Sequence, residues 1–348
     1  MGGAVTRHCP AMATDGAKPA HTRFLATPAR AHARRLVIHL GTVLTMGDDS
    51  DQQDFEQSRL ALFSRHGLEV AADWLVDRSG RRTAAVVGGT GETTLLIHGA
   101  ISDAGEWALV APHLAGRVVA VDWPGSGLTP PVDIRGIGIR RFASEWLDSV
   151  IEAIGAPVRI VGSSAGGYLA LLYALARPQN VNRMVQVGSF PGLTPATPLI
   201  FRLFATPLVG RLMLRQQPKD AEANRKQVFS NLVSDADRLP VDVLEADLAA
   251  TALPGAARSA HDFCRALVNP LTGVRKNLLL TDQELAGLTV PVHVLWGSAD
   301  NLLKPEAALS RFHGVSSAAT EIVDGAGHLM TLELPERVAA SSNAFFAA

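Results

Sequence analysis

The sequence predicts an α/β fold with a mostly parallel central sheet, helices on both of its faces, and a helical cap inserted into it. Two observations predict the sheet and the cap. Short apolar stretches of strand length alternate with stretches of helical period, and between residues 190 and 286 only helical periods occur. Strands that alternate with helices are typical of a parallel sheet covered on both faces. A long helical interruption of such an alternation indicates an insertion.

The composition agrees with a large, folded enzyme-sized chain and excludes some classes of partner. The 348 residues are 47% hydrophobic with a net charge of -1, so we expect no nucleic acid partner, which would need a clustered basic face. No apolar run reaches the length of a membrane span. Cys9 and Cys264 lie far apart and predict free thiols in a reducing, cytoplasmic compartment. We expect a monomer or homodimer.

Residues 1–45 differ from the rest of the chain. They hold six Lys/Arg, four His and one acid, Asp15, without helical or strand period, and predict a disordered extension. Arg34-Arg35 and the short apolar run after them weakly resemble an export signal, but no small-residue cleavage site follows. Met46 begins an ordinary acidic start, so the preceding residues can also be an over-extended reading frame.

Residues 46–189 predict the first part of the core. In chain order we expect a helix at 52–66, a hairpin of strands at 68–76 and 83–87, a strand at 93–97, a helix at 107–114, a strand at 118–121, a helix at 139–154, a strand at 157–161, a helix at 168–176 and a strand at 183–187. The strand at 93–97 is wholly apolar, as is typical of a strand buried on both faces of a parallel sheet.

Residues 190–286 predict the cap, and residues 287–348 the second part of the core. The cap helices are expected at 197–216, 221–232, 241–252 and 256–268. The first is apolar on more than one face, and we expect one face, with Phe201 and Phe204, to roof an apolar pocket. Its basic residues, Arg202, Arg211 and Arg215, are too few to favour a membrane-surface role. The remaining elements are expected at 290–295, 305–312, 321–323 and 335–346.

The strand at 157–161 leads directly into the motif Gly162-x-Ser164-x-Gly166, and a helical run follows. A serine in so sharp a strand-to-helix turn takes a positive φ, which lifts its hydroxyl clear of the backbone. Residues two before and two after it must be very small, and glycine stands at both positions. Ser164 is therefore a candidate nucleophile.

Five features in this order closely resemble the α/β-hydrolase superfamily over residues 67–348. They are His98-Gly99, the Asp122-x-Pro124-Gly125-x-Gly127 loop, the turn at Ser164, the Trp296-Gly297-x-x-Asp300 loop and Gly327-His328. The resemblance implies the α/β-hydrolase fold and a catalytic triad of Ser164 as nucleophile, His328 as base and Asp300 as the acid that orients the base.

The rival residues are weaker candidates for these roles. Ser163 occupies an x position of the motif and would point away, and the other histidines lack the small-residue loop after a late strand. The strand after the turn helix ends without an acid, which leaves Asp300. Asp324 and Asp122 are interpreted as turn residues.

The resemblance also implies an oxyanion hole and a structural loop. The backbone N–H groups of Ala165 and Ala100 are expected to form the hole. His98, Gly99, Gly162 and Gly166 are expected to shape the turns around it. Trp107 and His261 join Phe201 and Phe204 as pocket candidates, although core packing is the simpler interpretation of Trp107.

We expect a serine hydrolase that cleaves an apolar carboxylic ester or lactone, a small molecule, without cofactor or metal. Serine at position 164 excludes the carboxylate-dependent dehalogenases and epoxide hydrolases of this fold. Hydrolytic C–C cleavage of a β-diketone-like acid is the first alternative. Relatives of that type often have Asn before a Met-flanked turn, whereas Ser163 and Ala165 stand here. Aminopeptidase, perhydrolase and non-catalytic receptor functions also remain open.

Overall fold

The computed structural model describes residues 49–348. Residues 1–45 lie outside the described residues. The structure therefore does not bear on whether they are a disordered extension, an export signal or an over-extended reading frame. The prediction of a free Cys9 lies there too.

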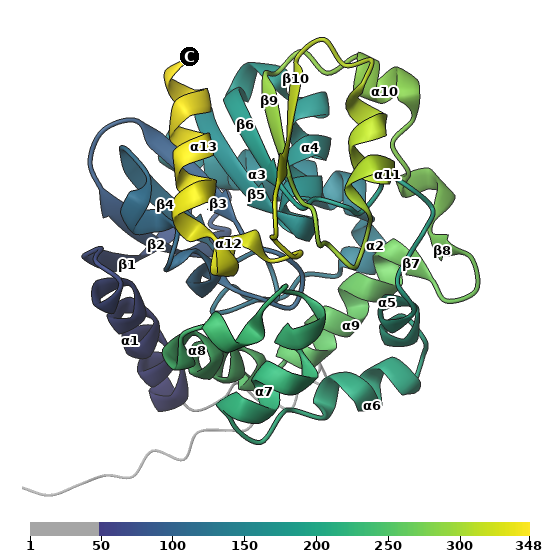
Figure 1. The fold of residues 1–348 in the computed structure, drawn as a ribbon. Coiled ribbons are helices and arrows are strands. Elements are labelled where there is room, and N and C mark those ends of the chain that lie inside the picture. Colours follow the sequence, from purple (N-terminus) through teal and green to yellow (C-terminus); the bar gives the residue numbers. More distant parts are fainter. Residues whose placement is uncertain (1–48) are drawn as a thin grey trace, which may run out of the picture. The chain divides into compact units, whose positions relative to one another are not determined.

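A central sheet of eight strands organises the described chain, in the order β1-β2-β4-β3-β5-β6-β9-β10 (Figure 1). Strands β1 and β2 form an antiparallel hairpin, and β2 is antiparallel to β4. All the other neighbours run parallel, which confirms the predicted sheet. The strands are β1 (Val70–Val76), β2 (Arg82–Gly89), β3 (Thr93–Ile97), β4 (Arg117–Val121), β5 (Val158–Ser163), β6 (Val181–Val187), β9 (Val292–Gly297) and β10 (Ala318–Val323).

Helices cover both faces of this sheet, so its central strands are buried on both sides. On β3, Leu95 and Ile97 belong to one hydrophobic core and Leu96 to the other, as the alternation of side chains along a strand requires. The first core includes α3 (Ile139–Ile154) and α4 (Ser164–Ala176). The second includes residues of α1 (Asp49–Arg65) and α13 (Pro335–Ala347).

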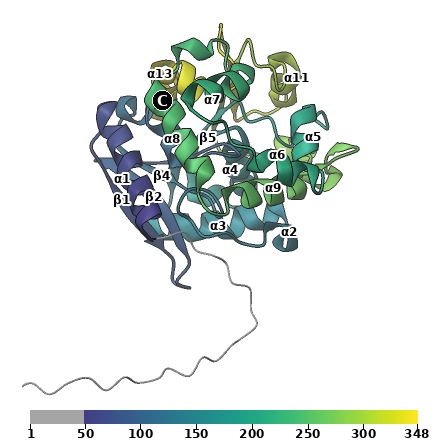
Figure 2. The same cartoon turned by 90° about the horizontal axis from the view of Figure 1, so that it is seen from below.

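The long helical stretch between β6 and β9 gathers at one end of the sheet, beside α1 (Figures 1 and 2). It contains α5 (Leu199–Phe204), α6 (Val209–Arg215), α7 (Ala221–Gln227), α8 (Val241–Ala252) and α9 (Ala256–Leu267). A small hairpin of β7 (Val268–Asn269) and β8 (Gly273–Val274) follows, which the sequence did not predict. Among the helices of residues 49–348, none combines the length and the apolar character that crossing a membrane requires.

Several predicted helices are wrong as single elements. The helix expected at 221–232 is α7, which ends at Gln227, followed by a 3₁₀ turn at Phe229–Asn231. The helix expected at 197–216 is divided into α5 and α6 at Pro207, because proline cannot donate the hydrogen bond that would continue α5. The helix expected at 107–114 is instead a pair of 3₁₀ turns, Ala104–Trp107 and Ala111–His113, with Pro112 in the second.

Short elements account for most of the other differences from expectation. The structure adds α2 (Ile134–Ile137), α10 (Asp282–Ala286) and α12 (Met330–Glu333), each too short to leave a periodic pattern. The helix expected at 305–312 is α11 (Pro305–Leu309) followed by a 3₁₀ turn.

Candidate active site

Ser164 lies at the first position of α4, directly after β5, with φ at 47°. A non-glycine residue at positive φ carries strain that the surrounding structure must hold. The two glycines of the motif make the turn possible. A Cβ on Gly162 would lie 2.6 Å from the Gly167 Cα, and one on Gly166 would overlap the carbonyl oxygens of Ile97 and His98. The fold therefore requires both glycines for close packing of backbone against backbone.

Ser164, His328 and Asp300 meet although they come from three separate strand ends. The His328 Nε2 atom lies 3.0 Å from the Ser164 Oγ, and its Nδ1 lies 2.9 Å from the Asp300 Oδ2. A histidine with Nδ1–H donating to Asp300 leaves Nε2 as the acceptor of the serine proton. All three side chains are buried. Asp300 is held in place because its Oδ1 accepts the Leu302 N–H at 2.8 Å.

The hydroxyl of Ser164 opens into a cavity of about 620 Å³ between the helical segment, α1 and the loop after β3. The walls are mostly apolar, with Phe201, Phe204 and Leu214 among them. The structure thus places Phe201 and Phe204 where the sequence predicted. The cavity also reaches Gly99 and Ala100, so a carbonyl group in contact with Ser164 would lie beside that loop.

The predicted oxyanion hole consists of two backbone N–H groups, those of Ala165 and Ala100. Ala165 is the second residue of α4, and N–H groups in the first turn of a helix have no intrahelical acceptor. The positive end of the helix dipole also favours negative charge there. The Ala100 N–H has no hydrogen-bond acceptor among residues 49–348. The preceding N–H, that of Gly99, is occupied because it donates to the Glu106 Oε2 at 2.8 Å.

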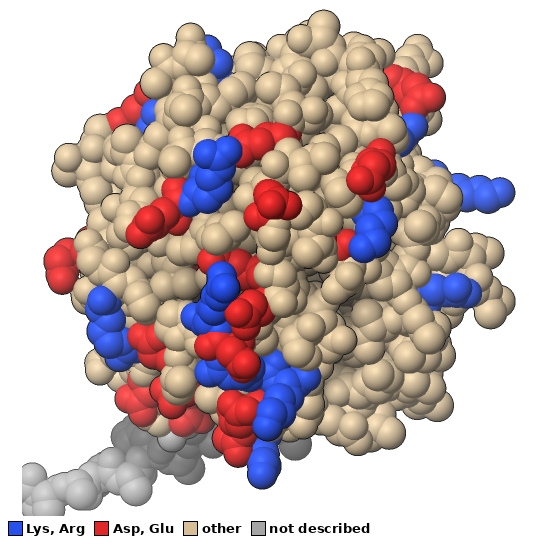
Figure 3. Space-filling model, viewed as in Figure 1, with Lys and Arg blue, Asp and Glu red and all other residues tan. Residues whose placement is uncertain are grey.

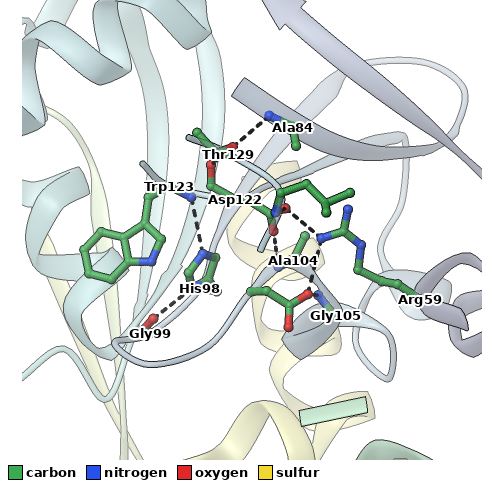
Figure 4. A network of polar contacts seen from close by, with 11 residues as sticks. Arg59, Ala84, His98, Gly99, Ala104, Gly105, Asp122, Trp123 and Thr129 are labelled. Atoms are coloured by element: carbon green, nitrogen blue, oxygen red, sulfur yellow. Dashed lines mark hydrogen bonds and ion pairs between the residues drawn. The ribbon is translucent and has the colours of Figure 1, made fainter. Parts of the chain in front are cut away.

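A buried ion-pair network holds the loop after β3 in place (Figure 4). The Arg59 Nη1 of α1 lies 2.7 Å from the Asp122 Oδ2 and 3.4 Å from the Asp103 Oδ1. The other carboxylate oxygen of Asp122 accepts the Ala104 N–H at 2.8 Å. Burial alone would lower the pKa of Arg59, but the two carboxylates raise it overall. Asp122 therefore does more than its predicted turn role, since it ties the loop after β3 to α1.

His98 has the structural role that the sequence predicted. Its Nδ1 lies 2.8 Å from the Gly99 carbonyl oxygen, and its Nε2 accepts the Trp123 N–H at 3.4 Å (Figure 4). Those partners require the neutral ring with the proton on Nδ1. Burial lowers the pKa of His98, which keeps the ring in that state. The ring links the loop after β3 to the loop after β4.

Sequence reasoning missed the acidic part of the cavity wall. Asp247 of α8 lines the cavity with Asp103 and Glu106, and its Oδ2 accepts the Asn224 Nδ2–H at 3.0 Å. Removal from bulk water raises the pKa of Asp247 to about 7, and the nearby charges of Asp103 and Glu106 add to the increase. Removal from water also raises the pKa of Asp103 to about 6, against the effect of Arg59. No local motif marks these acids, because two distant segments, the loop after β3 and α8, bring them together.

The raised pKa of Asp247 predicts a pH-dependent stability. The pKa of Asp247 is about 4 in the unfolded chain and about 7 in the folded protein. Between these pH values the folded state binds more protons than the unfolded state. The free energy of unfolding therefore falls as the pH rises from about 4 to about 7. We expect Asp247→Asn to gain about 1–2 kcal/mol relative to the wild type between pH 5 and pH 8, allowing for the solvent at this half-buried side chain. Urea unfolding at both pH values measures the difference.

Glu245→Gln provides the matched control, because Glu245 is an exposed carboxylate on the same helix. An equal gain in Glu245→Gln, or none in Asp247→Asn, would contradict the assignment of the effect to the cavity wall.

Two predicted pocket residues do not line the cavity. Trp107 is fully buried in the core beneath the loop after β3, in agreement with the simpler interpretation. His261 is buried between α9 and α6, where a Cβ on Gly210 would lie 3.0 Å from its Cδ2. Burial lowers the pKa of His261, so its ring packs as a neutral group. The pocket role proposed for His261 is therefore not supported, and Trp107 follows the simpler of its two interpretations.

The one cysteine within the described residues, Cys264, is an unpaired and buried thiol, and burial raises its pKa to about 12. A thiol with so high a pKa is unreactive. Across residues 49–348, no group of three or more His, Cys, Asp or Glu residues is arranged to hold a metal ion.

Known proteins share this fold and part of this sequence. The model of a family described as the alpha/beta hydrolase family matches residues 94–341. A 2-hydroxy-6-oxononadienedioate/2-hydroxy-6-oxononatrienedioate hydrolase from Cupriavidus pinatubonensis is 27% identical over 248 residues, which cover 69% of this chain and 82% of that protein.

Solved structures of two kinds of hydrolase resemble the chain. Carboxylesterase CesB from Bacillus subtilis has a TM-score of 0.68 at 22% identity, over 85% of this chain and 98% of that one. A 2-hydroxy-6-oxo-6-phenylhexa-2,4-dienoate hydrolase from a Rhodococcus strain has a TM-score of 0.68 at 20% identity, over 81% of this chain and 100% of that one. At these identities the structural likeness shows the fold alone. The family match spans most of the chain, and the chain therefore belongs to the alpha/beta hydrolase family and is an enzyme of the hydrolase class.

Proposed function

We propose that this enzyme is a serine hydrolase that cleaves a neutral carboxylic ester or lactone with an apolar acyl or alkyl group, through an acyl-enzyme on Ser164. The observation that carries the proposal is the hydrogen-bonded series Ser164–His328–Asp300 at the wall of a mostly apolar cavity. A serine hydroxyl is a weak nucleophile, and it needs a base within hydrogen-bond reach and a third group to orient that base.

In the first half of the reaction, the Ser164 Oγ attacks the carbonyl carbon while the His328 Nε2 takes the hydroxyl proton. The carbonyl oxygen becomes an oxyanion, which the N–H groups of Ala165 and Ala100 would stabilise. Asp300 accepts from Nδ1–H and stabilises the imidazolium that forms. The C–O bond to the alcohol then breaks, and His328 donates its proton to the departing alkoxide.

In the second half, a water molecule replaces the alcohol. His328 takes a proton from the water as the oxygen attacks the acyl carbon, and a second oxyanion forms in the same position. This intermediate collapses with cleavage of the bond to the Ser164 Oγ. The serine recovers its proton from His328, and a carboxylic acid leaves. No step requires a cofactor.

Hydrolytic C–C cleavage is the second candidate, because several relatives are named as hydrolases of 2-hydroxy-6-oxo acids, and one similar solved structure is titled a meta-cleavage product hydrolase. The name of the Cupriavidus relative specifies a dioate, a substrate with two carboxylates. The cavity of this chain suits such a dianion poorly. Arg59 is the only Lys or Arg among the described residues that line it, and Arg59 is already paired with Asp103 and Asp122. Asp247, Asp103 and Glu106 would repel a carboxylate. The charge of the cavity wall therefore favours a neutral ester.

A pair of esters of equal length tests this choice. We expect kcat/KM for p-nitrophenyl esters to rise about fourfold for each added CH₂ until the cavity is filled, since each buried CH₂ contributes about 0.8 kcal/mol. We also expect the mono-p-nitrophenyl ester of adipic acid to react at least about tenfold more slowly than p-nitrophenyl hexanoate, because its terminal carboxylate enters the acidic wall.

A 2-hydroxy-6-oxodienedioate substrate completes the comparison. A higher kcat/KM for this dioate than for every ester would overturn the ester proposal in favour of C–C cleavage. Tight binding of esters without turnover would instead indicate a receptor.

A further inference from the structure

Six of the eleven large apolar side chains that are exposed within residues 49–348 lie on α5, on α6, at the junction between these helices, and in the turn between β7 and β8. We call this group the apolar patch; it consists of Leu199, Ile200, Leu208, Val209, Leu212 and Leu271. Arg202 of α5 donates to the carbonyl oxygens of Pro270 and Leu271, at 2.7 Å each, and so holds the turn between β7 and β8 beside α5. Scattered exposed apolar residues are normal, but a contiguous group of this kind marks an interaction surface.

The two helices beneath the patch are apolar on both sides. Phe201, Phe204 and Leu214 face the cavity, whereas Leu208 and Leu212 on the opposite side are 76% and 63% exposed. A helix between a protein core and water normally has a polar outer face. Apolar residues on both faces are typical of a helix that contacts the cavity on one side and an apolar binding partner on the other.

The backbone at Leu208 is strained, yet nothing within the described chain covers its side chain. Its φ is 65° and ψ is -54°, a conformation that costs energy for a residue with a Cβ. The strain holds a leucine outward at the junction of α5 and α6, directly after Pro207. A strained residue that presents an exposed apolar side chain indicates a contact outside the chain.

The segment that carries most of the patch has charged residues of one sign. Residues 190–219 contain no Asp or Glu, but they contain Arg202, Arg211, Arg215 and Lys219. Arg211 and Arg215 are exposed and four residues apart, which places them on one side of α6 beside Leu212. In Figure 3 charged side chains of both signs gather over the regions of α1, α7 and α8, and the region of α5 and α6 is largely free of acids.

We propose that the apolar patch docks on an anionic lipid bilayer, with Leu208 and Leu212 at the boundary between headgroups and acyl chains and with Arg211 and Arg215 against the lipid phosphates. Apolar side chains flanked by cations are what such a surface recognises. A second copy of the chain fits less well, because a two-fold contact would place the two arginine pairs close together without acids from residues 190–219. The basic residues alone are too few to favour a membrane-surface role. The exposed leucines add the apolar contact with the acyl chains that the sequence pattern did not reveal.

Flotation of the full-length protein with vesicles tests the docking without any substrate. We expect the wild type to float with vesicles of phosphatidylglycerol and phosphatidylcholine in equal parts, less at high salt, and not with phosphatidylcholine alone. Leu208→Glu/Leu212→Glu should abolish flotation. Arg211→Gln/Arg215→Gln should weaken it about 30-fold, which is about five- to sixfold for each of the two cations removed.

Val76→Glu/Ile322→Glu is the matched control, because it places two glutamates at sites that are each 50% exposed and lie outside the patch. The control should float like the wild type. Leu208 and Leu212 do not line the cavity, so their variant should also hydrolyse a soluble p-nitrophenyl ester as the wild type does.

Three results would overturn the docking proposal: no flotation of the wild type, equal loss in the control, or a wild-type dimer that the leucine substitutions dissociate and that does not bind vesicles. The vesicle assay does not involve hydrolysis, so its failure would leave the proposed esterase activity untouched.

Discussion

Ser164→Ala is expected to lower kcat for p-nitrophenyl hexanoate by about 10⁴–10⁶-fold without loss of the fold. Alanine removes the Oγ that lies 3.0 Å from the His328 Nε2, so no acyl-enzyme can form and water must attack the ester directly. Steady-state kinetics measure the loss, and urea unfolding checks the fold. The positive φ at this position persists in the alanine variant, so we expect little change in stability.

Ser163→Ala is the control for this experiment, because Ser163 is the adjacent buried hydroxyl. Its Oγ makes no hydrogen bond within residues 49–348, so its removal should leave kcat within about threefold of the wild type. A fluorophosphonate probe, which reacts with activated serines, should label the wild type and Ser163→Ala. Labelling of Ser164→Ala, or turnover by it near the wild-type rate, would show that another residue is the nucleophile.

Arg59→Met is expected to reduce the free energy of unfolding by about 3–5 kcal/mol, the largest stability effect that we predict. Arg59 is 2% exposed and is the cation that the described structure pairs with both Asp103 and Asp122. Methionine keeps much of the volume of the side chain but leaves two buried carboxylates without a cation. Urea unfolding at pH 7, followed by tryptophan fluorescence, measures the loss.

The loss should be smaller at pH 5 than at pH 7. The pKa of Asp103 is about 6 even beside Arg59, so acid neutralises one of the two carboxylates in the variant. Arg65→Met, on the same helix, removes a half-exposed arginine that pairs with Asp242 at the surface, and it should cost no more than about 1 kcal/mol. Equal losses at Arg59 and Arg65 would show that burial of the network does not control stability.

The sequence predicted the sheet and the positions of Ser164, Asp300 and His328 because their signals are local. A strand such as Thr93–Ile97 is recognisable from five residues, and the turn at Ser164 from the spacing of two glycines. The parallel sheet then brings residues that follow different strands to the same edge. Their hydrogen bonds agree with the expected geometry, and their catalytic roles stay predictions.

The acidic wall and the buried arginine could not be predicted in this way. Asp247, Asn224 and Arg59 lie in ordinary helical patterns, and only packing between distant helices turns them toward the cavity. The division between α5 and α6 did have a local signal in Pro207, which was outweighed by the continuous apolar period around it. His261 shows the opposite error, because an aromatic residue close to a site in the sequence does not have to face that site.

The antiparallel hairpin of β1 and β2 also limits how far the chain can be shortened at its N-terminal end before the fragment aggregates. The family match begins at residue 94, yet β2 pairs with β4 through Ala85–Gly89 opposite Arg117–Val121. A fragment limited to residues 94–341 would leave β4, with its buried valines, as an open sheet edge, and open apolar edges recruit further chains into aggregates. The N-terminal hairpin therefore protects the sheet from self-association, and we expect the smallest soluble fragment to include β1 and β2, upstream of the residues that the family model matches.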